Sequence, residues 1–350
     1  MRKFDYLFLK EAIPGRLIRL AEDIAELRTK ESFYKKSNED TFAALKERTV
    51  FDSVCSSNEI DGVTTTDARI RALINGDYPT SKDEAMIRGY ADSLDMIGIQ
   101  HEKLSFDEEL ILNIHKMIFG NGEQGSMSSS VSGYKTEDIY IFGMGADGSN
   151  RVRLNPVAAD EIPAAIAELT DACNAAMRDP EVPKLFMIPC VVLDFLRIQP
   201  FGDGNERISR LLGEFLLFKS GLDICTFVPL SKLLQKRKDE YYSAIEKSSD
   251  NWAENENDYL PFIEFMLQMI KWAYHELDDN FIEVTRKKAS KQERIESILM
   301  NTFVPVSKNE IMERLPDVSV RTVEVTLKRL LDEGKISKVG SFRDARYKKK

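Results

Sequence analysis

The sequence has little of the residues that build metal centres and disulfide frameworks. It holds three histidines, four cysteines and two tryptophans among 350 residues. No cysteine belongs to a Cys-x-x-Cys pair or stands beside a histidine at metal-ligand spacing. We therefore expect buried thiols in a reducing compartment. The four cysteines are Cys55, Cys173, Cys190 and Cys225.

Long hydrophobic runs are also missing. The most apolar stretch, Leu185–Leu196, is too short to span a bilayer and contains Pro189 and Asp194, so it predicts a buried core helix. Charges and a proline occupy the N-terminal region where a signal peptide needs an apolar segment. These features predict a cytoplasmic protein without a membrane partner.

An excess of positive charge is absent as well. The formal net charge is −9, which argues against binding nucleic acid or an anionic membrane with the whole surface. Hydrophobic residues make up 43% of the chain, enough for a sizeable core. The length predicts two or three domains.

Helical periodicity dominates what is present. Apolar residues recur three and four positions apart in ten segments, which predicts a mainly α-helical fold. These segments are 17–30, 41–53, 68–73, 82–97, 108–119, 158–178, 184–196, 208–219, 232–247 and 259–284.

Alternating patterns are confined to two places. Residues 139–142 and 151–154 flank the glycine-rich Gly143–Gly148, which predicts a β-hairpin. Near the C-terminus, Ile336–Val339 and Ala345–Tyr347 predict a two-stranded wing around Gly340.

The charged run Arg286–Arg294 predicts a linker ahead of this C-terminal region. Beyond it, the patterns predict a helix over Glu293–Met300, a second helix opened by the capping box Ser307–Glu310, and a third over Val320–Glu333. Three short helices with a β-wing are similar to a winged-helix module.

The most informative segment joins two apolar helices and reads Gln-Pro-Phe-Gly-Asp-Gly-Asn-Glu-Arg-Ile-Ser-Arg, from Gln199 to Arg210. One interpretation is an ordinary helix–helix turn in which Asp203 or Asn205 caps the second helix. The segment also resembles the signature loop of the Fic (Fido-domain) family, His-Pro-Phe-x-Asp/Glu-Gly-Asn-Gly-Arg-x-x-Arg. Six positions match in register: Phe201, Asp203, Gly204, Asn205, Arg207 and Arg210.

The residues themselves suit a polyphosphate. Unpaired N–H groups and the dipole at a helix N-terminus favour an anion. Arg207 and Arg210 are three apart and share one helix face, and guanidinium groups match phosphate oxygens. A carboxylate at Asp203 can hold Mg²⁺ that bridges phosphates.

The resemblance implies transfer of AMP from ATP, with Mg²⁺, to a hydroxyl of a target protein. It implies a Fic-type helical core with a β-hairpin flap and a C-terminal winged helix. Asp203 would be the metal ligand, Gly204 and Asn205 would belong to the anion hole, and Arg207 and Arg210 would hold the phosphates.

Two departures affect the chemistry. Gln199 stands where the family has its catalytic histidine, and an amide is not a useful base near neutral pH. Glu206 replaces the second glycine, and it is expected to repel phosphates or block the pocket, with a second metal ligand as the alternative. The three histidines lie far away in sequence, and His115 is expected to be a hydrogen-bonded core residue.

Other segments extend the resemblance. Ser57, Asp61 and Gly62 match the family's inhibitory helix motif, with Arg210 as the implied partner. Aspartate is one methylene shorter than the family's glutamate, so we expect a weaker or water-bridged pair. An ordinary helix end is the alternative.

Gly133–Leu154 matches the family's flap, which adds the target segment as a strand, with Tyr134, Lys135 and Thr136 at its start. A plain surface hairpin is the alternative. Tyr242, the second of Tyr241-Tyr242, matches a tyrosine near the adenine, although core packing is the commoner role of such a pair.

The resemblance predicts three parts: an N-terminal helical region (1–95), a Fic core (96–285), and a linker with a winged helix (286–350). The first functional hypothesis is an adenylyltransferase with impaired catalysis. The second is a regulator that acts through a DNA-binding winged helix, with the core as a nucleotide sensor or dimerisation platform. A third is that Gln199 was introduced by mutation, against which Glu206 argues.

Overall fold

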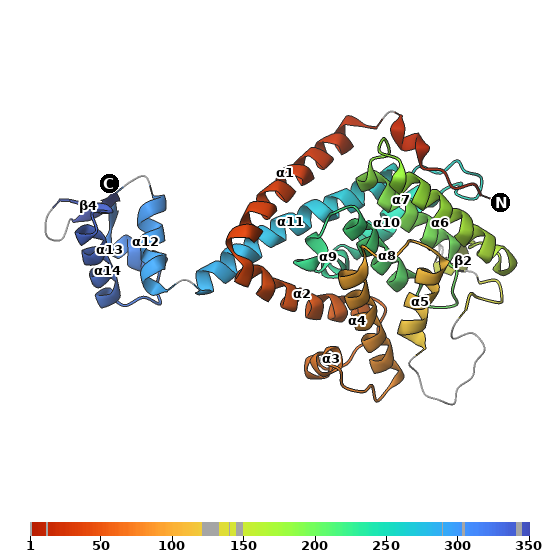
Figure 1. Cartoon of the computed structure of the whole chain (residues 1–350), viewed down its shortest axis with the longest axis horizontal. Coiled ribbons are helices and arrows are strands. Elements are labelled where there is room, and N and C mark those ends of the chain that lie inside the picture. The colour runs from red at the N-terminus through yellow and green to blue at the C-terminus, as the bar shows by residue number, and fades with distance from the viewer. Residues whose placement is uncertain are drawn as a thin grey trace. The chain divides into compact units, whose positions relative to one another are not determined.

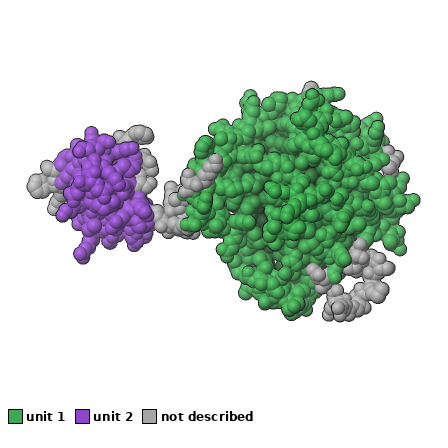
Figure 2. Space-filling view, in the orientation of Figure 1, with its two compact units in different colours: residues 1–277 green, residues 278–350 purple. Residues whose placement is uncertain are grey.

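The structure of the chain is a computed structural model that describes residues 2–11, 13–120, 133–139, 141–144, 150–288, 290–302, 305–340 and 345–350. The chain divides into two compact units, residues 1–277 and 278–350 (Figure 2). The division of the first unit near residue 95 stays a prediction.

The first unit is built from helices, as the periodicity predicts (Figure 1). The predicted helix over 232–247 is in fact two helices, because the chain turns at Arg237 between α9 and α10. The helices are α1 Gly15–Ser37, α2 Glu39–Ile60, α3 Asp67–Ile74, α4 Lys82–Gln100, α5 Glu108–Phe119, α6 Ile162–Arg178, α7 Lys184–Ile198, α8 Asn205–Lys219, α9 Leu230–Lys236, α10 Lys238–Ser249 and α11 Leu260–Lys288, with short 3-10 turns at Leu7–Lys10, Ala159–Glu161 and Ile224–Thr226.

Helices α7 and α8 form the centre of the core (Figure 1). Almost all of α7 is buried, Pro189 and Asp194 included, which confirms the predicted core helix. Phe195 and Phe201 are fully buried near the turn between the two helices, and Phe215 is fully buried further along α8. Within the described residues, no helix combines the length and the apolar character that a bilayer span requires.

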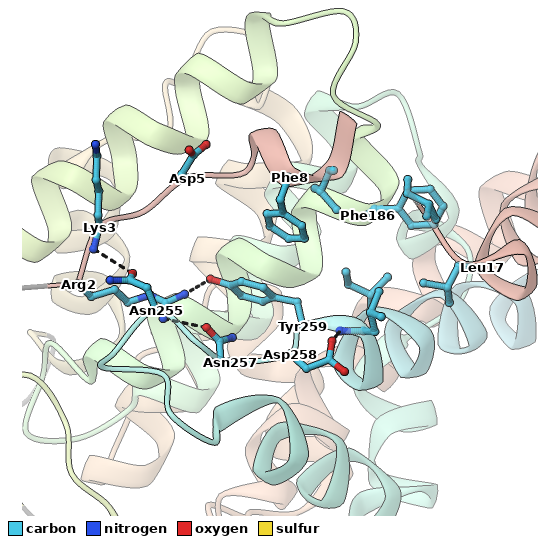
Figure 3. Close-up of a pocket in the computed structure, with 14 residues that line it drawn as sticks. Arg2, Lys3, Asp5, Phe8, Leu17, Phe186, Asn255, Asn257, Asp258 and Tyr259 are labelled. Carbon is cyan, nitrogen blue, oxygen red and sulfur yellow. Dashed lines mark hydrogen bonds between the residues drawn. The ribbon is translucent and has the colours of Figure 1, made fainter. Parts of the chain in front are cut away.

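A buried polar network fastens the N-terminal segment to α7. The fully buried Asp194 accepts hydrogen bonds from the Tyr6 hydroxyl at 2.9 Å, the Trp252 indole at 2.7 Å and the Tyr259 hydroxyl at 2.8 Å. Arg2 lies 3.4 Å from the same carboxylate and donates to Tyr259 (Figure 3). The network holds α7 in place a few residues before the turn into α8.

A cavity of about 590 Å³ lies beside this network (Figure 3). One wall is apolar, with Phe8, Leu17 and Phe186, and the other carries Lys3 and Asn255. None of the residues that line it belongs to the segment 199–210, so this cavity is separate from the site that the sequence singles out.

The predicted hairpin is present. Strand β1 Ile141–Met144 pairs antiparallel with β2 Asn150–Leu154, and Phe142 lies opposite Val152. The register is irregular between Ile141 and Phe142. Residues 140 and 145–149, which include part of the predicted glycine-rich turn, lie outside the described residues.

In its described residues, the second unit contains the end of α11, three further helices and a three-stranded antiparallel sheet in the order β3-β5-β4. Its own hydrophobic core includes Ile295, Ile311, Val323 and Leu327. The predicted helices and both strands of the wing are observed, whereas β3 has no sequence signal because it spans two residues. The elements are α12 Lys291–Asn301, β3 Val306–Ser307, α13 Lys308–Arg314, α14 Val320–Asp332, β4 Ile336–Val339 and β5 Arg346–Lys349.

The predicted linker over Arg286–Arg294 is mostly helical. Helix α11 continues to Lys288 and α12 begins at Lys291. Ser290 and Glu293 form a capping box, in which each side chain binds the other's backbone N–H. The charged run that predicted a linker therefore contains the start of helix α12.

Candidate functional site

The turn between α7 and α8 begins at Gln199, which has a left-handed backbone with φ of 49°. Its side chain is buried, and its Nε2 donates to the carbonyl of Leu196 at 2.9 Å. The amide is therefore folded back onto the end of α7. A buried amide of this kind offers no proton acceptor of useful basicity.

Asn205 fixes the loop from within. Its Oδ1 accepts the N–H of Phe201 at 3.0 Å and its Nδ2 donates to the Phe201 carbonyl at 2.8 Å. The Phe201 ring is buried and stacks on His115, with centroids 4.0 Å apart. The Asn205 side chain therefore shapes the loop and does not cap α8, which corrects one predicted role.

Gly204 stands at the N-cap of α8 with φ of 82°, where no side chain caps the helix. A Cβ at this position would lie 2.4 Å from the Phe119 ring, so the close approach requires glycine. The exposed Asp203 accepts the Gly204 N–H, at 2.7 Å, and does not cap the helix either. The first turn of α8 thus keeps N–H groups and a dipole that favour an anion.

Asp61, the residue at the end of α2, binds both arginines of the loop. Its Oδ2 lies 2.8 Å from Arg207 Nε and 2.7 Å from Arg210 Nη2. Ser57 adds two bonds to Arg210, through its hydroxyl and its carbonyl, each at 3.0 Å. The chain leaves α2 through Gly62, with φ of 75°.

The alternative of a water-bridged pair is therefore wrong, whereas the strength of the pair stays a prediction. The shorter aspartate reaches Arg210 directly, and it reaches Arg207 as well. Arg207 and Arg210 are buried, at 3% and 9% exposure, and the Nη1 atom of each has no partner among the described residues. The two cations depend on one carboxylate.

Glu206 and Tyr242 form the other contact of the site. The Tyr242 hydroxyl donates to Glu206 Oε2 at 2.7 Å. Burial, and then this hydrogen bond, raise the pKa of Tyr242 well above its usual value. Tyr241 is buried and packs on Phe262, as expected for a core residue. Glu206 is thus held by the tyrosine that the resemblance assigns to the adenine.

His115 lies against the loop although it is distant in sequence. Its ring stacks on Phe201 and on Phe119. Burial lowers the pKa of His115 to about 4, so the ring is neutral at neutral pH and weakly basic. The predicted core position is observed, but Nδ1 has no hydrogen-bond partner among the described residues. Sequence spacing gave no sign of this proximity.

The first segment of the flap touches the loop. The Tyr134 ring lies 5.7 Å from that of Phe201, and its hydroxyl donates to Glu108 at 2.9 Å. The Lys135 N–H donates to the carbonyl of Pro200 at 2.9 Å. Thr136 is exposed. The flap is thereby fastened to the residue that follows Gln199.

The Asp203 carboxylate suits a metal ion that is bound together with the phosphates of a ligand. Among the described residues no group of three or more His, Cys, Asp or Glu side chains is placed to hold an ion. Protein sites for Mg²⁺ often supply one or two carboxylates and leave the remaining positions to water and phosphate. Asp203 is exposed at the loop and fits such a site.

These features define a helical protein whose candidate site lies on a loop between two core helices. A sequence model of the Fic/DOC family matches residues 105–217, which contain α5, the hairpin, the whole loop and most of α8. The chain therefore contains a Fic/DOC family domain, as the resemblance of the loop predicted.

A curated relative, Protein adenylyltransferase Fic of Nematostella vectensis, is 24% identical over 239 residues, which are 64% of this chain and 47% of the relative. The chain spans about half the length of that relative.

Solved structures share the fold. A Fic family protein from Desulfovibrio desulfuricans has a TM-score of 0.62 at 18% identity, and the match covers 97% of each chain. A Fic domain containing signaling protein from Bacteroides thetaiotaomicron has a TM-score of 0.61 at 19% identity, over 75% of this chain and 97% of that one. The predicted Fic-type, mainly helical fold is thus confirmed.

Proposed function

We propose that this protein binds ATP with Mg²⁺ at the loop 199–210 and transfers AMP to a protein hydroxyl slowly or not at all. The observation that carries the proposal is the pair of buried arginines, Arg207 and Arg210, one turn inside an uncapped helix N-terminus. Guanidinium groups and free N–H groups are the donors that a polyphosphate requires.

Impaired transfer follows from Gln199 and Glu206. A glutamine amide cannot remove the proton of a target hydroxyl, and loss of a general base typically costs about 10²–10⁴-fold in rate. The Glu206 carboxylate adds negative charge to the first turn of α8, where the resemblance puts the phosphates. Gln199 acts on transfer and Glu206 weakens phosphate binding, whereas the arginines and Asp203 support the binding that is retained.

Asp61 is proposed to inhibit the site. A phosphate at Arg207 or Arg210 competes with the carboxylate that already binds both. Ligand affinity is then reduced by the fraction of molecules in which the arginines are released.

We expect ATP with Mg²⁺ to bind in the micromolar to millimolar range and to raise the melting temperature of the full chain. Arg210→Ala should weaken binding about tenfold, because it removes a charged hydrogen-bond donor. Calorimetry measures both. Arg19→Ala, which changes an exposed arginine on α1, is the control and should leave affinity unchanged. A melting temperature that does not move at saturating ATP contradicts the proposal.

A second candidate is a regulator that acts through the second unit as a winged helix. The element order, with three helices and a three-stranded sheet, supports it. Residues 318–350 carry ten basic and four acidic side chains in an otherwise acidic chain. Arg321 and Lys328 are exposed on α14.

Several of the basic side chains are already paired. Arg329 and Lys335 both bind Glu296 and Glu333, and Arg346 binds Glu310. Arg343, another of the ten basic residues, lies outside the described residues. Val320 and Val325 are about half exposed on α14, which favours the alternative of a protein contact.

For this candidate we expect weak duplex binding by fragment 278–350, which has its own core, with affinity that falls steeply as salt rises. Lys328→Ala should reduce the slope of log affinity against log salt concentration by about 1, the contribution of one phosphate contact. The already paired Lys335 serves as the matched control, and Lys335→Ala should have less effect. Fluorescence anisotropy measures both. An absence of binding at low salt excludes the DNA role and leaves a protein-docking module.

A further inference from the structure

Lys135 is a buried cation without a counter-charge at hydrogen-bond distance. The residue is 6% exposed, and its Nζ has no hydrogen-bond partner among the described residues. Burial lowers the pKa of the ammonium, and the carboxylate of Asp138 opposes this shift. Asp138 itself accepts the Ala159 N–H at 2.8 Å. A buried charge left unpaired is costly, so a lysine here needs a reason.

The backbone fixes Lys135 against the loop. Its N–H donates to the Pro200 carbonyl, and the neighbouring Tyr134 packs its ring on Phe201. The Lys135 side chain therefore starts from a backbone that contacts Pro200, the residue that follows Gln199 in the candidate site. An apolar residue would fill a buried position of this kind at lower cost.

The other two cations of the loop already have an ion-pair partner, although they share a single carboxylate. Arg207 and Arg210 share the Asp61 carboxylate, whereas Lys135 forms no ion pair within the described part of the chain. An incoming anion would supply the counter-charge that the protein lacks at this point. Costly unpaired charges of this sort are typical of functional sites.

We propose that Lys135 is a phosphate-binding residue of the candidate site, contributed by the flap and assigned by none of the loop motifs. The inference rests on the proposed function, because it concerns the phosphates of the same ligand. It adds a contact that does not depend on release of the arginines by Asp61. Bound phosphate would also hold the flap against the loop through the Lys135 side chain.

The test compares full-length parent protein with Lys135→Met, which removes the charge but keeps an unbranched side chain, and with Lys135→Arg, which keeps the charge. The probe is inorganic pyrophosphate with Mg²⁺, measured by calorimetry and by thermal shift. Lys135→Met should raise the melting temperature without ligand. It should also weaken pyrophosphate binding by about tenfold to a hundredfold, the equivalent of one charged hydrogen bond.

Lys135→Arg should retain most of the affinity. Lys116→Met, on the exposed surface of α5, should change neither quantity. If Lys135 had only a structural role, Lys135→Met would not raise the melting temperature and at the same time weaken pyrophosphate binding. If Lys135→Met does not fold, Lys135→Gln replaces it, with the same expected loss.

The inference is overturned if Lys135→Met binds pyrophosphate as tightly as the parent. It is also overturned if neither the parent nor Asp61→Ala binds pyrophosphate at all. Parallel titrations with ADP and Mg²⁺ separate the two proposals. Binding of pyrophosphate that depends on Lys135, with ADP no tighter, supports the phosphate contact and rejects the nucleotide. Binding of ADP that does not depend on Lys135 supports the nucleotide site and rejects the phosphate contact of Lys135.

Discussion

Replacing Gln199 by histidine and Glu206 by glycine together is expected to raise AMP transfer about 10²–10⁴-fold, the usual contribution of a general base. Histidine is compatible with the backbone at residue 199, because it tolerates the left-handed region better than most residues. An imidazole there restores a proton acceptor next to the loop. Removal of the Glu206 side chain also breaks its hydrogen bond with Tyr242 and clears the first turn of α8.

Each single change should restore much less. With Gln199→His alone, the Glu206 carboxylate still adds negative charge where the resemblance puts the phosphates, and with Glu206→Gly alone residue 199 supplies no base. Asp61→Ala added to the double change should increase transfer further. The measurement is incorporation of label from ATP labelled at the α-phosphate, into the protein itself and into a lysate.

The control for this experiment is Asp203→Ala in the doubly changed protein, which should abolish the label if Asp203 holds the metal. The parent should not label above background. Strong labelling of the parent would mean that another residue acts as base, and the impaired-catalysis proposal would fail. A doubly changed protein that folds, binds ATP and stays silent would show that the loop differs from a transferase site in more than these two residues.

The sequence predicted the helices well because their apolar faces repeat within one segment. It did not predict how α2 and α8 approach each other. The spacing of Arg207 and Arg210 places them on one helix face, yet only the packed structure brings Asp61 within reach of both. Long-range positions of this kind leave no local signal.

Predictions from local sequence patterns were wrong where two patterns overlap in one segment. Asp203 and Asn205 are good cap residues, but Gly204 takes the N-cap and Asn205 turns to the Phe201 backbone. The charged run after residue 286 hides the capping box of Ser290 and Glu293. The approach of His115 and Tyr134 to Phe201 joins three segments and required the fold.

Replacing Asp61 by alanine is expected to destabilise the free protein and strengthen phosphate binding. Arg207 and Arg210 are almost fully buried, so loss of their shared carboxylate leaves two uncompensated charges. Breaking a buried pair costs roughly 3–5 kcal/mol, and the partial exposure of Asp61 places the expected loss near about 3 kcal/mol. Thermal or denaturant unfolding measures this loss.

The same change removes the competitor of the ligand. ADP with Mg²⁺ should bind at least about tenfold more tightly to Asp61→Ala, because the arginines no longer have to be released before they bind phosphate. The ligand should also raise the melting temperature of this variant more than that of the parent, since it restores the missing negative charge.

The matched control for this prediction is Asp52→Ala. Asp52 is another carboxylate of α2, and its partner Lys232 is substantially more exposed than the two arginines. Because exposed pairs contribute little, this variant should lose about 1 kcal/mol or less and keep the affinity of the parent. If Asp61→Ala is destabilised but binds ADP no better than the parent, Asp61 is a structural ion-pair partner and does not inhibit the site. If it is neither destabilised nor tighter in binding, the arginines do not depend on Asp61 in solution.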